Sequence, residues 1–311
     1  MSSRIPRPTD PSISVVVPTR DRPELLRRAL TSIVGQRYDG DIEVIVVFDQ
    51  GTPSDVGIPD AEARHIRTIA NDRIAGLAGA RNCGVLAASG DLVAYCDDDD
   101  EWHPDKIRRQ VEALADEPLA EVVVTGTAIV YGSRTIDRIP PNAHVTFDDL
   151  LRSRVQDVHP SSIVVKRAAM LEGIGLVDEE IPGSYGEDWD WLLRAARRGP
   201  ILVVRSPLTR AYWHQASFFA DRWTSIIDAI HYLLAKYPEL YGDRRGLARR
   251  YGRLAFAHAA LGNRQEARTW ARRAIRLDPR ERRAYLALAV SWRLVSAPTL
   301  MRLAHRRGRG I

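Results

Sequence analysis

The first third of the chain alternates short apolar runs with stretches of helical periodicity. Three runs, 13–17, 42–48 and a weaker one at 65–69, predict strands. Apolar residues at helical spacing follow the first run, and 75–88 predicts a helix leading into a further strand that ends at Asp97. Because strands and helices alternate, we expect an α/β fold with a parallel sheet covered on both faces.

Beyond Pro118 the pattern is less regular. The runs 121–125 and 162–166 predict strands, whereas the Gly/Pro-rich stretch 132–142 and the segment 173–183 predict loops. We expect this half of the domain to shape a second substrate pocket.

The rest of the chain predicts helices. Acidic residues in the first turn indicate a helix that opens at Gly186 and ends near Arg198, and an all-helical region begins at about Leu247. Three positions of that region recur 34 residues later: Tyr251, Leu254 and Ala255 return as Tyr285, Leu288 and Ala289. This spacing predicts one complete tetratricopeptide-like unit and the first helix of another, with an ordinary helical hairpin as the alternative. Since such solenoids need about three repeats, we expect these helices to pack on the preceding α/β part of the chain or on another chain.

These patterns divide the chain into four parts. We expect a flexible N-terminus at 1–11, an α/β domain at 12–217, a connecting helix at 218–246, and a helical segment with a basic tail at 247–311.

Composition narrows the class of protein. The 311 residues are 45% hydrophobic, which is ample for a buried core, and the net charge is only +5. Arginines crowd the C-terminal third, so a polyanionic partner is expected only there, and no nucleic acid is expected. Cys83 and Cys96 lack metal-ligand spacing and indicate buried thiols in a reducing compartment. Neither a signal sequence nor an apolar run long enough for a bilayer is evident, which favours a cytoplasmic protein.

Polar residues follow the carboxyl ends of three predicted strands, namely Pro18-Thr19-Arg20, Asp49 and Asp97–Asp100. Open α/β sheets bind ligands at this edge. Four consecutive carboxylates repel one another and resist desolvation, so a divalent cation and with it a phosphate partner are expected. The alternative is a solvated turn in which one Asp caps the helix that opens near Pro104.

Taken together, five motifs resemble glycosyltransferase family 2, the inverting enzymes with the GT-A fold: Val15–Arg20, Asp49, Gly79–Asn82, Asp97–Trp102 and Glu187–Trp189. The resemblance covers about 12–217 and implies metal-dependent transfer of a sugar from a UDP- or dTDP-sugar to a hydroxyl acceptor. The acceptor would be a glycan, a lipid-linked glycan or a small natural product. The half 12–117 is then expected to bind the nucleotide sugar and the half 118–217 the acceptor.

The resemblance assigns donor-side roles. Asp49 is expected to accept the ring N–H of uracil or thymine, with a turn-forming Asp as the alternative. Asp97 is expected near the ribose, and Asp99 to ligate Mn²⁺ or Mg²⁺. The full set expected to contact the nucleotide is Pro18, Thr19, Arg20, Asp49, Arg81, Asp97 and Asp98. Arg81 has a position on the helix surface as its alternative, and Asp100 is a supporting or capping candidate.

On the acceptor side, Asp188 matches the general base of the family, with Glu187 as nearest rival and Asp190 as a more distant one. His159 and Ser161 resemble the segment that borders the acceptor pocket, together with Ser162. Trp189, like Trp102, would offer an apolar platform to a sugar or belong to the core. His214 resembles a downstream histidine that reaches the metal or diphosphate, with a core histidine as its alternative.

The C-terminal stretch mixes apolar residues such as Trp292, Leu294 and Leu303 with arginines. It would suit contact with an anionic membrane at its inner face, or be a solvated tail. The helices before it would serve a protein partner or dimerisation. Two competing functions are a nucleotidyltransferase, whose glycine-rich loop is missing after the first strand, and a non-catalytic interaction protein.

Overall fold

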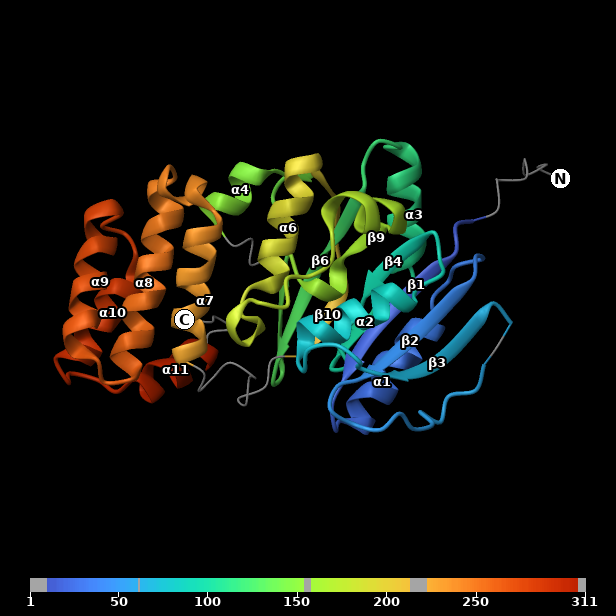
Figure 1. Cartoon of the computed structure of the whole chain (residues 1–311), viewed down its shortest axis with the longest axis horizontal. Coiled ribbons are helices and arrows are strands. Elements are labelled where there is room, and N and C mark those ends of the chain that lie inside the picture. The colour runs from blue at the N-terminus through green and yellow to red at the C-terminus, as the bar shows by residue number, and fades with distance from the viewer. Residues whose placement is uncertain (1–9, 61, 154–157, 213–222, 307–311) are drawn as a thin grey trace.

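A ten-stranded sheet forms the centre of the α/β part of the chain in the computed structural model, which describes residues 10–60, 62–153, 158–212 and 223–306 (Figure 1). Its backbone path runs in the order β3-β2-β1-β4-β9-β6-β10-β5. The first four strands along this path are β3 (Arg64–Ala70), β2 (Ile42–Phe48), β1 (Ile13–Thr19) and β4 (Leu92–Tyr95), all mutually parallel. Every residue of β1 and β4 is buried, as expected for strands covered on both faces.

The second half of the sheet, for which the sequence pattern beyond Pro118 is less regular, is mixed. The short strand β9 (Val164–Lys166) runs antiparallel to both β4 and β6 (Val122–Tyr131). Parallel to β6 lies β10 (Ile201–Tyr212), a strand that the sequence pattern does not predict.

Three short strands complete the sheet. The edge strand β5 (Asp100–Trp102) is antiparallel to the end of β10, and β8 (His144–Val145) pairs with its beginning. β7 (Arg134–Arg138) forms a hairpin with β6. The stretch 132–142 is therefore not only a loop, and β5 places part of the acidic cluster inside the sheet.

Helices cover both faces. α1 (Pro23–Val34) and α3 (Lys106–Asp116) contribute to one hydrophobic core, whereas α2 (Leu77–Ala87), α4 (Phe147–Arg152) and α6 (Glu187–Arg198) contribute to the core on the other face. The short turns are α5 (Arg167–Ala169), η1 (Pro160–Ser162), η2 (Met170–Ile174) and η3 (Pro182–Ser184). α2 lies so close to β1 that a Cβ at Gly84 would approach Val16 Cγ1 to 2.3 Å.

A bundle of helices follows the sheet and fills the left-hand side of Figure 1. Its members are α7 (Trp223–Lys236), η4 (Pro238–Tyr241), α8 (Arg244–Ala260), α9 (Arg264–Leu277), α10 (Arg282–Ser291) and α11 (Ala297–Arg306). The prediction of an all-helical end is confirmed. Leu234 of α7 and Leu254 of α8 belong to the same continuous core as Leu192 of α6, so the helices pack on the sheet domain.

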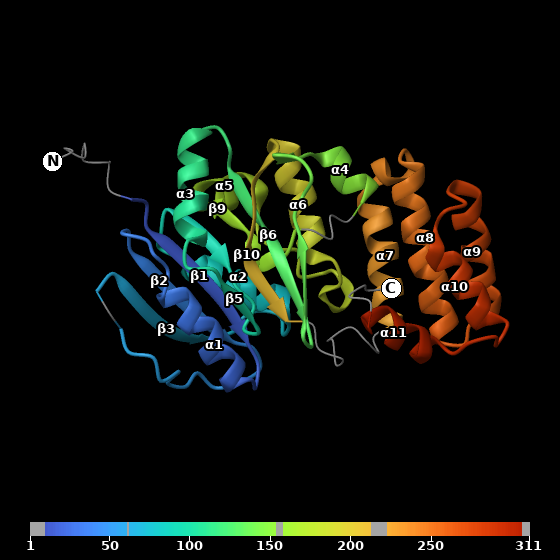
Figure 2. The same cartoon turned by 180° about the vertical axis from the view of Figure 1, so that it is seen from behind.

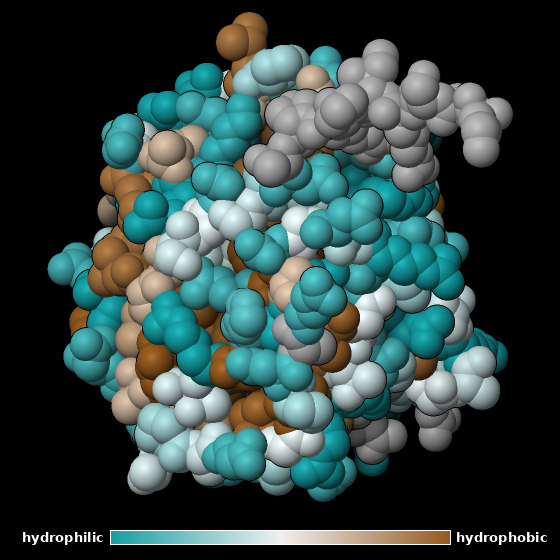
Figure 3. Space-filling model, turned by 90° about the vertical axis from the view of Figure 1, so that its right-hand side faces the viewer, coloured by the Kyte–Doolittle hydropathy of each residue, from teal (hydrophilic) through white to brown (hydrophobic). Residues whose placement is uncertain are grey.

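The sheet ends at β3, whose His65 and Arg67 are exposed. Charged side chains on an edge strand discourage pairing with another chain. Figure 3 views the molecule from this side, where hydrophilic side chains predominate and apolar ones lie in separate groups. Cys83 and Cys96 are both buried and free, as expected. Among the described residues, no helix has the length and apolar character that a membrane crossing requires.

Candidate active site

The four carboxylates occupy the turn from β4 to β5, at the carboxyl edge of the parallel strands. Asp98 and Asp100 are buried, whereas Asp97 and Asp99 remain partly exposed. α3 begins only after Asp105, whose side chain makes no capping hydrogen bond. The alternative of a solvated, helix-capping turn is therefore wrong.

Arg81 joins this cluster to the Glu-Asp pair of α6. Its Nη2 lies 2.6 Å from Asp97 Oδ1, and its Nη1 forms an ion pair with Glu187 Oε1. Burial would raise the pKa of Asp97, but Arg81 and His159 outweigh it and hold that pKa below its usual value. Arg81 is buried, so the alternative of a position on the helix surface is wrong. Glu187 directly precedes Asp188, so both acidic motifs lie at one place.

Asp98 is held from the first strand and its loop. Thr19 Oγ1 donates a 2.7 Å hydrogen bond to Asp98 Oδ2, and Arg22 Nη2 lies 2.7 Å from Asp98 Oδ1. Burial raises the pKa of Asp98 to about 6, although Arg22 and Thr19 act in the opposite direction. Arg22 also reaches Asp99 Oδ2 at 2.9 Å. Arg22 is not among the residues that the sequence predicts at this site, because a basic residue in a loop gives no sign of its partner.

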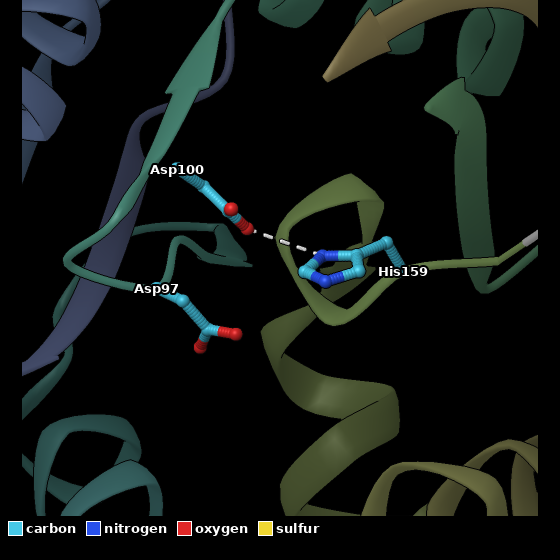
Figure 4. Close-up of side chains that lie close together, drawn as sticks. All are labelled: Asp97, Asp100 and His159. Atoms are coloured by element: carbon cyan, nitrogen blue, oxygen red, sulfur yellow. Dashed lines mark ion pairs between the residues drawn. The ribbon is translucent and has the colours of Figure 1, made fainter. Parts of the chain in front are cut away.

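A second set of contacts joins Asp100, next to Asp97, to the segment that carries His159 and Ser161, and Figure 4 shows the ion pair between Asp100 and His159. His159 Nδ1 is 3.2 Å from Asp100 Oδ2, and Ser161 Oγ donates to the same oxygen at 2.5 Å. The backbone N–H of Asp97 donates to Ser161 Oγ at 3.0 Å. Burial, together with Asp97 and Asp99, raises the pKa of Asp100 well above its usual value. Burial also lowers the pKa of His159, against the attraction of the nearby carboxylates.

The side chains around this turn suit a divalent cation. One ligand atom each from Asp97, Asp100 and His159 lies within 4.8 Å of the others. Carboxylate oxygens and imidazole nitrogen are donors that Mn²⁺ accepts, and Mg²⁺ prefers the oxygens. Asp99, the expected metal ligand, is partly exposed beside them. His214, the other expected ligand, lies outside the described residues.

Asp49 ends the second strand and is fixed by a neighbouring loop. Its Oδ1 accepts hydrogen bonds of 2.9 Å from Asn71 Nδ2 and from the Gly76 backbone N–H. These contacts orient the carboxylate, and a fixed orientation is what a hydrogen bond to the edge of a nucleotide base requires. Of the two residues flanking Thr19, Pro18 is buried and Arg20 is exposed.

Three residues expected on the acceptor side, Ser161, Glu187 and Trp189, are buried. Their polar groups are bonded within the chain. Trp189 Nε1 donates to the carbonyl oxygen of Leu150 at 2.9 Å. Trp102 is likewise buried. Both tryptophans therefore belong to the core, and an exposed platform for a sugar face is not formed by either.

Comparison with known proteins places the chain in a family. Residues 14–172 match the family described as glycosyl transferase family 2. The chain therefore belongs to this family of transferase enzymes, which does not support the nucleotidyltransferase alternative.

Two relatives illustrate the sequence similarity. An uncharacterized glycosyltransferase of Nostoc sp. is 28% identical over 178 residues, covering 53% of this chain and 54% of its own length. The chain thus spans about half of that relative. The amylovoran biosynthesis glycosyltransferase AmsB of Erwinia amylovora is 26% identical over 255 residues, covering 74% of this chain and 79% of its own.

Two solved structures show the GT-A fold. S. aureus TarS 1–349 in complex with UDP-GlcNAc matches with a TM-score of 0.58 at 16% identity, covering 96% of this chain and 92% of that one. The mannosyltransferase PcManGT of Pyrobaculum calidifontis, in complex with GDP-Man and Mn²⁺, gives a TM-score of 0.55 at 20% identity, with coverages of 94% and 87%.

Proposed function

We propose that this protein transfers a sugar from a nucleoside diphosphate donor to a hydroxyl acceptor, with inversion at the sugar carbon and with a divalent metal. The observation that carries the proposal is the ion-pair bridge through Arg81, which joins Asp97 to Glu187. It sets the general-base candidate Asp188 beside the carboxylates that suit a metal and a diphosphate. Electrostatic attraction between Asp188 and His159 supports the same proximity.

The donor is proposed to be a UDP- or dTDP-sugar. Uracil and thymine present a single ring N–H, which matches one carboxylate oxygen of Asp49. Asp49 is already oriented through its other oxygen by Asn71 and Gly76. Thr19 and Asp97 would contact the nucleoside. TarS was solved with UDP-GlcNAc and PcManGT with GDP-Man, so a guanine donor is the comparison that a binding experiment has to include.

The cation would be held by Asp99, with Asp97, Asp100 and His159 next to it. When bound, a divalent cation neutralises the charge that accumulates on the departing diphosphate. Arg22 contacts both Asp98 and Asp99, so it would have to rearrange or share these carboxylates.

Asp188 is proposed to accept the proton of the acceptor hydroxyl while that oxygen attacks the anomeric carbon. The bond between that carbon and the diphosphate oxygen breaks in the same step, and the electron pair leaves with the diphosphate. Because Asp188 serves as base and no protein nucleophile is needed, the configuration inverts. The acceptor would be the hydroxyl of a glycan, a lipid-linked glycan or a small natural product.

The test compares the wild-type chain with Asp188→Asn and Asp99→Asn in the presence of Mn²⁺ or Mg²⁺. Asp188→Asn should lower turnover of the donor roughly 10²- to 10⁴-fold while UDP affinity is kept. Asp99→Asn should abolish the metal-dependent thermal shift by UDP.

Asp148→Asn is the matched control, since Asp148 is an exposed acidic residue in the first turn of α4. It should change neither property. Unchanged turnover in Asp188→Asn would contradict the assigned base, and a thermal shift by GDP but not by UDP or dTDP would contradict the assigned donor.

A further inference from the structure

Large apolar side chains are exposed at one end of the helical bundle. Leu294 is 76% exposed and Trp292 55%, and both lie in the connection from α10 to α11. Leu303 of α11 and Leu261 at the end of α8 are also exposed. We call these four residues the apolar end. Exposed apolar groups of this size in one region indicate an interaction surface.

The course of the helices brings these residues to the same end. Arg244 Nη2 donates to the carbonyl oxygen of Leu277 at 3.3 Å, so α8 and α9 are antiparallel. Arg268 Nη2 donates to the carbonyl oxygen of Ser291 at 3.3 Å, so α9 and α10 are antiparallel as well. The last turns of α8 and α10 therefore lie at one end, and α11 contacts α8.

α11 is not simply an unpacked helix. Leu300 and Met301 are partly buried against the core of the bundle, whereas Leu303, two positions after Met301, is exposed. The exposed apolar groups are therefore left over after the bundle has formed its own core.

The apolar end lies toward the edge of the sheet that carries the candidate active site. Asp243, which caps α8, forms an ion pair with Arg152 at the end of α4. α4 follows β8, and β8 pairs with the first residues of β10. α8 thus starts near the amino end of β10. Figures 1 and 2 show α11 at the same lower edge to which β10 points.

The charge around the apolar end is positive. Residues 244–306 contain sixteen arginines and no lysine, against three acidic residues. Arg264, Arg293 and Arg302 are exposed at the apolar end, with Glu266 as the exposed carboxylate nearby. Tryptophan and leucine interleaved with arginine are typical of helices that lie in the interface of an anionic bilayer.

We propose that the apolar end docks on the surface of an anionic lipid bilayer, with the carboxyl edge of the sheet turned toward that surface. Trp292, Leu294 and Leu303 would enter the headgroup region, and the arginines would contact lipid phosphates. A second copy of the chain suits this surface less, because a two-fold contact would bring the arginines of both copies together. The proposal concerns attachment only and does not depend on the proposed transferase activity.

The test is co-sedimentation of the full chain with vesicles of phosphatidylcholine alone, or of equal parts phosphatidylcholine and phosphatidylglycerol. Binding is expected only to the anionic vesicles, and to weaken as salt is raised. The double variant Trp292→Ser/Leu294→Ser should bind at least about tenfold more weakly. The charge variant Arg293→Glu/Arg302→Glu should lose binding to a similar degree.

Leu119→Ser is the matched control, because Leu119 is 96% exposed but precedes β6 at the opposite edge of the sheet. It should bind vesicles as the wild type does. All substituted side chains are exposed, and an unchanged melting temperature would verify that each variant folds.

Two results would overturn the proposal. One is a lack of binding to anionic vesicles, or binding that the double variant retains. The other is a dimer in sedimentation velocity without vesicles that the double variant dissociates, since a second copy would then cover the apolar end.

Discussion

The guanidinium carbon of Arg250 lies 4.2 Å from the ring centroid of Trp189. Arg250 belongs to α8 of the helical bundle, and Trp189 follows Asp188 in the first turn of α6. The bundle therefore contacts the segment that carries the proposed general base. Trp189 also packs against Tyr237, which directly follows α7 of the bundle, and the centroids of the two rings are 6.1 Å apart.

We expect Arg250→Ala to lower the free energy of unfolding by about 1 kcal/mol, the size of a partly buried cation–π contact. Because Trp189 adjoins Asp188, turnover should also fall several-fold while the KM for the donor stays unchanged. Arg250→Lys should restore part of both losses. The matched control is Arg272→Ala, an exposed arginine of α9, which should change neither. If Arg250→Ala raised the KM for the donor by the same factor by which it lowered kcat, a positioning role of Arg250 would be contradicted.

The buried carboxyl of Asp98 predicts a pH-dependent stability. Burial raises its pKa from 3.8 to about 6. Between these values the folded state binds a proton that the unfolded state has lost, so this group makes stability fall as pH rises from about 4 to 6. Relative to wild type, Asp98→Asn should therefore gain stability over this range, by up to about 3 kcal/mol. Urea denaturation at pH 4, 5, 6 and 7 would measure this gain. A difference in stability between Asp98→Asn and wild type that does not change with pH would contradict the raised pKa of Asp98.

The buried amino group of Lys106 gives the stability of the protein the opposite dependence on pH, in a higher pH range. Its Nζ is buried without a hydrogen-bond partner among the described residues, 3.8 Å from the centroid of the Trp102 ring. Burial lowers the pKa of Lys106 from 10.5 to about 7. Between these values the unfolded state binds the extra proton, so this group reduces stability as pH falls from about 10 to 7.

Lys106→Met removes this titration and keeps the volume of the side chain. We expect the variant to be more stable than wild type at pH 7 by about 1–4 kcal/mol, with a smaller advantage at pH 10. Denaturation curves at both pH values check this. Arg108→Met, which changes an exposed cation on the same helix, should show no comparable gain. A less stable Lys106→Met would mean that the contact with Trp102 outweighs the cost of burial.

Gly79 links the packing of α2 to the carboxylate of Asp49. A Cβ at Gly79 would lie 1.9 Å from the carbonyl oxygen of Ile74, in the loop that bonds Asp49 through Asn71 and Gly76. Gly79→Ala should destabilise the protein by about 1–3 kcal/mol and weaken UDP binding, because the loop has to move.

Isothermal titration with UDP and urea denaturation test the Gly79 prediction. Gly199→Ala is the control, since no heavy atom lies within 4 Å of its added Cβ and its backbone is extended, with φ 174°. If Gly79→Ala lost stability but bound UDP as the wild type does, the packing of α2 would not affect the contact between Asp49 and the base, and the prediction would be wrong.

The parallel half of the fold was predictable because its strands are uninterrupted apolar runs. The run 42–48 corresponds to β2 residue for residue. β10 contains Arg205, Pro207 and Arg210, and its pairing with β6 shifts register around Pro207. A strand of this kind gains its stability from neighbouring strands, so local periodicity did not indicate it.

The candidate site, like the fold, was predictable from the sequence only in part. The carboxylates were found because acidic residues after an apolar run are unusual, and their place at the sheet edge follows from topology. Which of them is buried was not predictable, because Asp98 and Asp100 owe their burial to Arg22, His159 and Ser161. His159 and Ser161 lie about 60 positions after Asp100, and Arg22 lies in a loop near the N-terminus. No short motif records such contacts.

The continuous core shared by α6, α7 and α8 makes the bundle inseparable from the catalytic domain. Val16 of β1, Leu192, Ile230 and Leu254 belong to one cluster of buried residues. A chain cut before Trp223 would expose this cluster to water, so the helices are not a module that can be removed or exchanged. Heating should consequently melt sheet and bundle in a single cooperative transition.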